Sequence, residues 1–542
     1  MIGLDGATFD VVNPLIEEGR MPNLAGLIAA GASGCMRSTI PPISGPAWIS
    51  LATGMKPERT SIYDFTYRKA GSYSLEHISS ADYAGKAVWD YLSKAGRKVG
   101  ILNYPMFFPP YGVNGFISTG LGASDDDEFT YPATLKQELS KAVGGKYELY
   151  LSCHDIRYED TELFLNDVQR VLTKKLRAAA SLAREKQWDF FWFVLSETDS
   201  LQHLIWQHLD QRRSGSKPQS GKGFVERFEE LWGLVDRGIG ELCAIAGPQA
   251  NIVVLSDHGF GPCEGVFKLN VWLEREGYLT WRKGESRAFQ DAKEALCRRG
   301  RAIARAIRLH KLAPGLYGRA RATKGRLIGK IIDQIDQDKS VAFDPGHTIP
   351  FGGIYINDQI VTSPQKREEL SREIKEKLHN WADANNVSIE TWQRSDSPGA
   401  RANTGPDLLV GINDWGCVVL KERLTGEVFE RRPYSSRHTG SHRMNGIFVA
   451  AGPDIRPGAV EIVHLCDIAP TILHLFNVPV PADMDGRVRE DIVTAEYLKA
   501  HPAKFQNETA GNKSQETISQ AKEMTQQEKD FVQQQLKDLG YM

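Results

Sequence analysis

The sequence predicts an α/β protein with a doubly wound, mostly parallel central sheet flanked by helices. Over the first 120 residues, short apolar runs alternate with helical patterns, as they do in successive βαβ units. Two later runs, 188–195 and 252–255, are almost wholly apolar, which is typical of parallel strands buried on both faces. Because each crossover between parallel strands lays its helix on one face of the sheet, this alternation predicts helices on both sides.

The first elements are short and have clear boundaries. Residues 1–4 read as the last part of a buried strand. A helix over 22–30 begins at a proline and is closed by the glycine that follows it. A second helix over 86–95 also ends at a glycine and leads into a strand at 99–102. This part of the chain therefore supplies the first strands of the predicted sheet.

The next elements are longer. Apolar side chains recur every three or four residues over 161–186, which predicts an amphipathic helix before the strand at 188–195. The segment 212–223 is rich in Ser, Gly, Lys and Arg, so we expect a loop there. A helix near 224–246 precedes the strand at 252–255.

Four segments make up the predicted domain organisation. They are an α/β catalytic domain over 1–280 and 340–490, a basic helical insertion over 281–339, a linker over 491–515 and a C-terminal helix over 516–542. Residues 281–330 hold fifteen Lys and Arg against three acidic residues, a net charge of +12. This insertion fits a solvated helical subdomain, a basic cap over an anionic-substrate cleft, or a helix at a membrane surface.

The composition argues against several classes of protein. With 66 Lys and Arg against 68 Asp and Glu, the net charge of −2 argues against a nucleic-acid coat protein. No apolar run reaches the roughly 18 residues of a membrane-spanning helix. The seven cysteines are odd in number and lack a C-x-x-C pair, which favours a reducing compartment and a cytoplasmic protein. No signal peptide is visible, although a start inside a strand leaves open a signal sequence upstream of Met1.

Four positions place aspartate or histidine just after an apolar strand or a sharp turn. They are Asp5, the pair Asp199 and His203, the pair Asp257 and His258, and His442. Ligands of open α/β sheets lie beyond the carboxyl ends of the strands, so we expect these side chains to meet at one edge. His438, close to His442 in the sequence, is expected to lie outside this set or at the surface.

The types of these six side chains point to transition metals. Aspartate oxygens and histidine nitrogens together suit Zn²⁺ or Mn²⁺, whereas Ca²⁺ prefers oxygen alone. Six ligands are more than one tetrahedral zinc takes, so the sequence predicts two divalent ions, Zn²⁺ or alternatively Mn²⁺. The adjacent pair Asp257 and His258 can serve two neighbouring ions from a turn.

The candidate nucleophile is Ser44. Pro46 has a φ suited to a first helical turn, and Gly54 ends the predicted helix. Ser44 therefore lies at or just before a helix N-terminus, where amides and the helix dipole favour an anion. A serine that is also a metal ligand is a competent nucleophile at neutral pH. Taken alone, the position also fits a simple helix cap.

As a set, these motifs resemble the alkaline phosphatase superfamily, and within it the type I phosphodiesterase/nucleotide pyrophosphatase family. The matching segments are Gly3-Leu4-Asp5-Gly6-Ala7, Met21-Pro22-Asn23-Leu24, Ser44-Gly45-Pro46-Ala47-Trp48, Thr198-Asp199 with His203, Ser256-Asp257-His258-Gly259, Gly440-Ser441-His442 and Asp467-Ile468-Ala469-Pro470-Thr471. The resemblance covers about residues 1–490 and implies an alkaline-phosphatase-like fold.

The resemblance implies a two-metal hydrolase, usually a zinc enzyme. The implied ligand sets are Asp199, His203 and His442 for one ion, and Asp5, Asp257 and His258 for the other, with Ser44 at the second ion. The chain departs from the family in two ways. The family often has Thr where this chain has Ser44, and many relatives carry His-Gly after the nucleophile helix where this chain has Thr60-Ser61. Trp48 stands where related sulfatases have arginine, which argues against a formylglycine sulfatase.

The expected function is hydrolysis of phosphoesters, of the phosphodiesterase or nucleotide pyrophosphatase type. Ser44 would attack phosphorus in line, and hydrolysis of the phosphoserine would complete the turnover. The alternatives are a phosphomonoesterase, a phosphoglycerate mutase or a phosphonate hydrolase of the same superfamily, and a non-catalytic protein that binds phosphorylated ligands. The expected partner is a small phosphoester, such as a nucleotide or a lipid head group, and no nucleic acid is expected.

The basic insertion motivates a kinetic prediction. Its charge of +12 leaves −14 for the rest of the chain, and such segregation is typical of an anionic partner. Charge reversal at Arg298, Arg299, Arg301 and Arg305 is expected to lower kcat/KM for anionic substrates, and the loss should shrink as salt screens the charges. An unchanged kcat/KM at low salt would show that the insertion does not steer the substrate.

Overall fold

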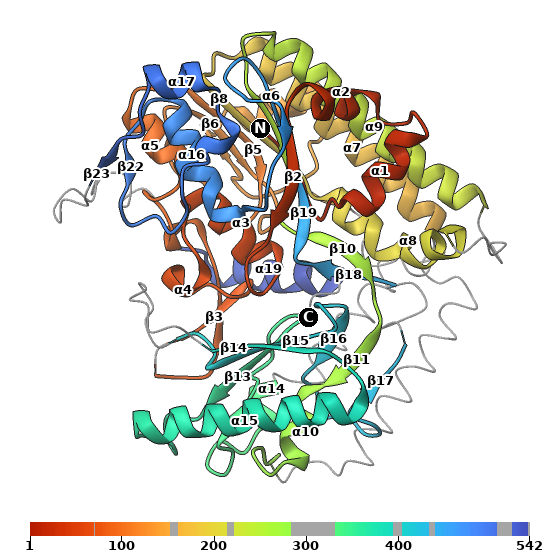
Figure 1. The fold of residues 1–542 in the computed structure, drawn as a ribbon, viewed down its shortest axis with the longest axis vertical. Coiled ribbons are helices and arrows are strands. Elements are labelled where there is room, and N and C mark those ends of the chain that lie inside the picture. Colours follow the sequence, from red (N-terminus) through yellow and green to blue (C-terminus); the bar gives the residue numbers. More distant parts are fainter. Residues whose placement is uncertain are drawn as a thin grey trace.

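The chain forms two lobes (Figure 1). The computed structural model describes residues 1–69, 71–151, 161–213, 222–282, 331–393, 404–432, 439–506 and 523–539. The sheet lobe contains the central sheet and the larger apolar cluster. The second lobe consists of the described residues between 265 and 430, and most of its apolar side chains belong to a separate cluster.

The centre of the main sheet is parallel. Strand β1 (Ile2–Leu4) lies between β8 (Phe190–Leu195) and β9 (Ile252–Leu255), and both pair with it in parallel. Next to β8 follow β5 (Val99–Tyr104) and β6 (Gly115–Thr119), again in parallel. All residues of β1, β5 and β8 are buried, which explains their nearly continuous apolar sequences.

Further strands complete this sheet on both sides, and β19 (Asn445–Ala451) on one side and β7 (Thr130–Tyr131) on the other form its antiparallel pairs. Beyond β9, β19 runs antiparallel to both β9 and β2 (Ala32–Arg37). The short strands at the edges are β7, β20 (Gly458–Ala459) and β21 (Val463–His464). In the described residues the order is β20-β2-β19-β9-β1-β8-β5-β6-β7, with β21 also paired to β2.

Helices cover both faces of the sheet (Figure 1). One layer contains α2 (Pro22–Ala30), α7 (Thr161–Glu185) and α9 (Lys222–Ala246), and α9 contacts the other two. On the other face α3 (Ser44–Thr53) and α5 (Val88–Lys94) pack with α16 (Ile468–Leu475). The further helices of the sheet lobe are α1 (Phe9–Glu17), α4 (Pro57–Thr60), α6 (Leu135–Val143), α8 (Glu197–Arg213), α17 (Ala495–Ala500) and α19 (Gln526–Leu539).

The predicted fold class is confirmed, and many predicted elements have the expected bounds. Helix α2 and strand β9 coincide with the predicted ranges 22–30 and 252–255. The predicted loop over 212–223 is shorter, because α8 continues to Arg213 and α9 already begins at Lys222. In the described part of the chain, no helix combines the length and apolar character needed to cross a membrane.

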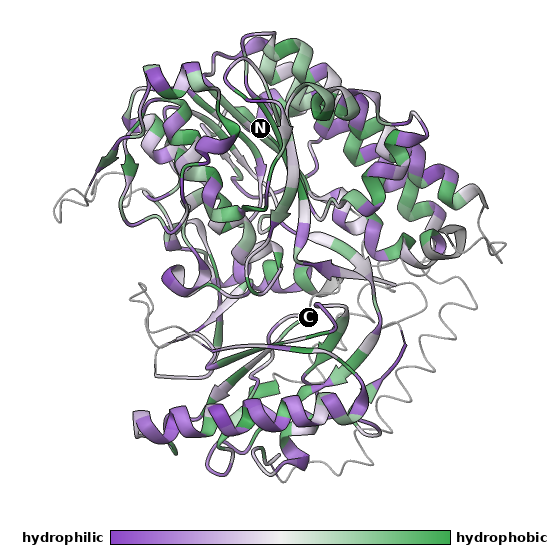
Figure 2. Ribbon diagram, in the orientation of Figure 1, coloured by the Kyte–Doolittle hydropathy of each residue, from purple (hydrophilic) through white to green (hydrophobic). Residues whose placement is uncertain are grey.

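The second lobe has its own sheets. Strands β12 (Ala342–Phe343), β13 (Gly352–Ile356), β15 (Leu408–Ile412) and β14 (Ile389–Gln393) form one, and β16 (Cys417–Leu420), β11 (Gly265–Lys268) and β17 (Phe429–Glu430) form another. Helix α15 (Pro364–Asn385) packs on β13 and β14. Figure 2 shows hydrophilic and hydrophobic residues interspersed along α15, and Ile374, Leu378 and Ala382 at four-residue spacing form its buried stripe. Two short helices, α10 (Leu269–Arg275) and α14 (Ile331–Gln334), complete the lobe.

The packing differs in part from the predicted domain organisation. The prediction grouped 340–490 with the central sheet, whereas the part up to residue 430 contributes mainly to the second apolar cluster. The alternating pattern of a strand does not reveal which sheet the strand joins. Most of the predicted insertion, residues 283–330, lies outside the described residues. The predicted linker over 491–515 contains α17, and α19 lies within the predicted C-terminal helix.

Candidate active site

The carboxyl ends of three neighbouring strands bring the predicted aspartates together. Asp5 follows β1 directly, and its backbone N–H donates to the Leu195 carbonyl at the end of β8 (3.0 Å). Asp257 lies two residues beyond β9, and its Oδ1 accepts the Gly6 N–H (3.1 Å). Asp199 lies in the first turn of α8. The exposed fractions of these three aspartates are 3%, 0% and 5%, respectively.

A two-stranded ribbon next to this edge positions two histidines. Strand β10 (Gly259–Pro262) begins directly after His258, and it pairs antiparallel with β18 (Gly440–Arg443), which contains His442. The rings of His258 and His442 stack with centroids 3.8 Å apart. Phe260, opposite His442 in the ribbon, also contacts the ring of His203, with centroids 4.7 Å apart. The Phe260 ring therefore restricts the orientation of the His203 and His442 rings beside it.

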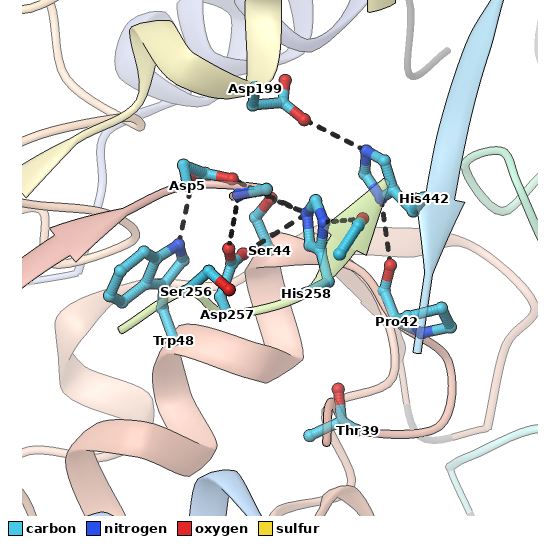
Figure 3. Close-up of polar contacts among 12 residues, drawn as sticks. Asp5, Thr39, Pro42, Ser44, Trp48, Asp199, Ser256, Asp257, His258 and His442 are labelled. Atoms are coloured by element: carbon cyan, nitrogen blue, oxygen red, sulfur yellow. Dashed lines mark hydrogen bonds and ion pairs between the residues drawn. The ribbon is translucent and has the colours of Figure 1, made fainter. Parts of the chain in front are cut away.

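Two groups of side chains can each hold a metal ion. One consists of Asp5, Asp257 and His258, and the other of Asp199, His258 and His442. Within each group the candidate ligand atoms lie within 4.8 Å of one another. His258 belongs to both groups, so the two sites are neighbours (Figure 3). All of these side chains are buried, and their mixture of oxygen and nitrogen suits a transition metal.

The orientation of the histidines fits metal ligation. Nδ1 of His258, His442 and His203 lies 3.0–3.1 Å from the backbone carbonyl of Gly259, Pro42 and Gly440, respectively. A carbonyl oxygen only accepts, so each Nδ1 carries the proton and donates it. When the ring is neutral, its Nε2 therefore presents a lone pair, the arrangement found in histidine ligands of metals.

These lone pairs face carboxylates. Nε2 of His442 lies 3.2 Å from Asp199 Oδ1, and Nε2 of His203 lies 3.6 Å from the same oxygen. Nε2 of His258 lies 3.4 Å from Asp257 Oδ2. A neutral imidazole and a carboxylate repel each other in this arrangement, and a cation between them removes the repulsion. The described residues thus fit a metal centre.

The electrostatics of the aspartates lead to the same conclusion. Burial, together with the negative charges of Asp257 and Asp199, raises the pKa of the Asp5 carboxyl well above its usual value. Burial also opposes ionisation of Asp199, but His203 and His442 in their protonated forms outweigh it and hold the pKa of Asp199 below its usual value, so a positive charge at this position stabilises the carboxylate. Burial lowers the pKa of His258, which favours the neutral ring that a metal requires. Divalent cations would stabilise this concentration of buried carboxylates.

Ser44 lies where the sequence places it, at the first residue of α3. Its Oγ is 3.2 Å from His258 Nε2 and 3.5 Å from Asp5 Oδ1, and the residue is 1% exposed. The candidate nucleophile thus adjoins the Asp5, Asp257 and His258 group, as the resemblance implies. The positive end of the α3 dipole points toward the same space.

The sequence analysis gave no role to several residues that support the site. Thr198 Oγ1 donates to the Asp5 carbonyl (2.7 Å), and Gln202 Nε2 donates to the Gly6 carbonyl (2.7 Å). Ser256 Oγ donates to the Ala7 carbonyl (2.9 Å) and accepts the N–H of Ile447 (2.8 Å). These bonds fix the turn that carries Asp5. Thr198 and Ser256 stand directly before Asp199 and Asp257, and this adjacency was the available signal.

A buried ion pair supports the start of α8. Lys175 of α7 donates to Glu197 across 2.7 Å, and the two side chains are 1% and 2% exposed. Glu197 lies two residues before Asp199. The pair therefore connects α7 to the helical turn that presents Asp199. Its two residues are far apart in the sequence, and no pattern indicated the contact.

His203 differs from the other predicted ligands in its position. His203 is not in either group of candidate ligands, and His258 takes its predicted place beside Asp199 and His442. Nε2 of His203 nonetheless faces Asp199, so His203 lies at the same site. His438 and the four arginines Arg298, Arg299, Arg301 and Arg305 lie outside the described residues.

The sequence profile described as "Type I phosphodiesterase / nucleotide pyrophosphatase" matches residues 1–442. The chain belongs to this family. Its members are divalent-metal-dependent phosphoester hydrolases, and the chain is an enzyme of this class. No curated protein sequence matches this chain.

Solved structures similar to this family member include relatives from mammals and bacteria. Murine ectonucleotide pyrophosphatase/phosphodiesterase 5 is 11% identical, with a TM-score of 0.47 over 91% of this chain and 99% of that chain. The human protein of the same name is 12% identical, with a TM-score of 0.46 over 91% and 99%. Phosphonoacetate hydrolase from Sinorhizobium meliloti 1021, in complex with phosphonoformate, is 12% identical, with a TM-score of 0.48 over 86% and 93%.

Proposed function

We propose that this enzyme cleaves a phosphodiester or pyrophosphate bond with Ser44 as the nucleophile. The observation that carries the proposal is the position of Ser44 Oγ, 3.2 Å from His258 and 3.5 Å from Asp5 at the N-terminus of α3. A serine in this position reaches both a candidate metal site and the positive end of a helix dipole.

Two divalent ions, for which we propose Zn²⁺, are part of the proposed site. The residues that would hold them are Asp5, Asp257 and His258 with Ser44, and Asp199, His203 and His442. When bound, such ions stabilise negative charge on the nucleophile and on the phosphoryl oxygens. Mn²⁺ suits the same mixture of oxygen and nitrogen ligands.

The chain's own residues then perform the following steps. Ser44 Oγ loses its hydroxyl proton, attacks phosphorus in line and forms a bond to it. The bond from phosphorus to the leaving oxygen breaks, and that oxygen takes up a proton. The N-terminus of α3 stabilises the negative charge of the phosphoryl group. Water next cleaves the phosphoserine and releases the product, which restores the Ser44 hydroxyl. Burial of Ser44 and the surrounding aspartates keeps bulk water away from the reacting groups.

The substrate that we propose is a small phosphoester, with a nucleotide as the first candidate and a lipid head group as the second. The family description supports the nucleotide, and the basic segment 281–330 supports an anionic substrate. We also propose a cytoplasmic location. Its support is the odd number of cysteines, of which the five in the described residues form no disulfide.

A paired substrate assay tests the preference for diesters. With zinc present, kcat/KM for bis(p-nitrophenyl) phosphate is expected to exceed that for p-nitrophenyl phosphate by about tenfold or more, a difference of about 1.4 kcal/mol in the activation barrier. Both compounds release the same chromophore, so one absorbance measurement serves for both. A preference for the monoester would favour the phosphomonoesterase alternative. Absence of turnover on either compound, with metal bound, would favour the non-catalytic alternative.

A further inference from the structure

The carboxylate of Asp5 is held from one side by a tryptophan. Trp48 lies on α3, four residues after Ser44, and is fully buried. Its indole Nε1–H donates to Asp5 Oδ2 across 3.3 Å (Figure 3). The same helix therefore carries both the candidate nucleophile and a hydrogen-bond donor to a candidate metal ligand.

The two oxygens of Asp5 have different surroundings. Oδ2 accepts the indole proton of Trp48. Oδ1 lies 3.5 Å from Ser44 Oγ and 3.6 Å from His258 Nε2, so it faces the candidate metal site. With one oxygen bound to the indole, the carboxylate presents only the other oxygen to an ion.

The surrounding residues prevent the indole from turning away. Tyr104 packs edge-on against the Trp48 ring at 5.6 Å, and its hydroxyl donates to the Trp48 carbonyl (2.7 Å). Gly3 in β1 provides the space for the ring, because a Cβ there would lie 2.5 Å from Trp48 Cη2. The position of the donor is thus determined by the first strand and by β5.

An indole also suits this place for an electrostatic reason. It offers a single N–H donor and no charge. An arginine at this position would place a permanent cation beside Asp5, where it would compete with a metal ion for the carboxylate. A neutral donor satisfies one oxygen and leaves the negative charge of Asp5 available to the metal.

We propose that Trp48 is a positioning residue that holds Asp5 as a one-oxygen ligand of the metal ion next to Ser44. This inference rests on the metal centre of the proposed function. Hydrogen bonds from outside the ligand set to ligand side chains typically change metal affinity 10- to 100-fold. Trp48 is therefore expected to affect the affinity of one ion far more than that of the other, which does not use Asp5.

The test compares Trp48→Phe with Trp192→Phe. Trp192 of β8 is also fully buried and packs on Tyr104, but among the described residues its Nε1 has no hydrogen-bond partner. Zinc binding is measured by calorimetry on metal-free protein. In Trp48→Phe, the affinity for one of the two ions is expected to fall about 10- to 100-fold, and Trp192→Phe is expected to bind both ions as the wild type does. Turnover of Trp48→Phe should recover in excess zinc, with a raised zinc requirement and kcat within a few-fold of wild type.

Two outcomes would overturn the proposal. The first is that Trp48→Phe binds both zinc ions with the same affinities as the wild type. The second is that Trp192→Phe loses as much zinc affinity as Trp48→Phe does. If Trp48→Phe does not fold, β-(3-benzothienyl)alanine at position 48 retains the shape of the ring and removes only the N–H, and the same affinities decide. Failure of the wild type to bind zinc or manganese would instead contradict the proposed function, so the two failures are distinguishable.

Discussion

Replacement of Ser44 by alanine is expected to lower kcat by about three orders of magnitude or more. The substitution removes the oxygen that lies 3.2 Å from His258 Nε2 and 3.5 Å from Asp5 Oδ1, and nothing else at the start of α3 changes. Because Ser44 is only one of several proposed ligands, metal content and thermal stability should remain close to those of the wild type. The measurement is steady-state turnover of a phosphodiester, with zinc content determined on the same sample.

The chain offers a matched control for this variant. Ser50 lies on the same helix and is also 1% exposed, so Ser50→Ala removes a buried hydroxyl away from the candidate metal sites. It is expected to retain turnover, and Ser44→Thr is expected to retain a substantial part. Wild-type turnover in Ser44→Ala would mean that water attacks phosphorus directly and that no phosphoserine forms.

Removal of the metal ions is expected to abolish turnover and to destabilise the fold. Three buried aspartates with exposed fractions of 0–5% then lose the cations that compensate their charge. An ion present at 100 times its dissociation constant contributes about 2.7 kcal/mol to stability, so two ions contribute about 5 kcal/mol. Elemental analysis should find about two transition-metal ions per chain, and chelation should lower both the activity and Tm.

A pair of acid-to-amide variants distinguishes the metal sites from general effects of buried charge. Asp257→Asn changes a member of one ligand group and is expected to lose an ion. Asp90→Asn is the control. Asp90 lies on α5 and accepts hydrogen bonds from the Ala87 N–H and the Tyr111 hydroxyl, and burial raises the pKa of this carboxyl to about 7. Zero or one ion in metal-replete wild-type protein would contradict the two-metal site.

A large part of the fold and site was determined by the sequence, because the relevant signals are local. The apolar run of β8 and the glycine after α2 each reflect a few neighbouring residues. Asp5 and Asp257 stand one and two residues beyond apolar strands, and parallel strands end at a common edge. Ser44 stands two residues before Pro46, whose φ suits the first turn of a helix. Adjacent residues carry this information, so no tertiary contact is needed to read it.

Tertiary structure alone decided which residues support these candidate ligands and which ligand belongs to both groups. Trp48 contacts Asp5 across 43 positions, and the carbonyl that orients His442 belongs to Pro42, 400 positions away. That His258 lies within reach of both ligand groups depends on the pairing of β10 with β18. The assignment of residues up to 430 to a second apolar cluster likewise depends on which strands pair. A local pattern records whether a side chain is buried, but only chain packing determines which distant side chain it meets.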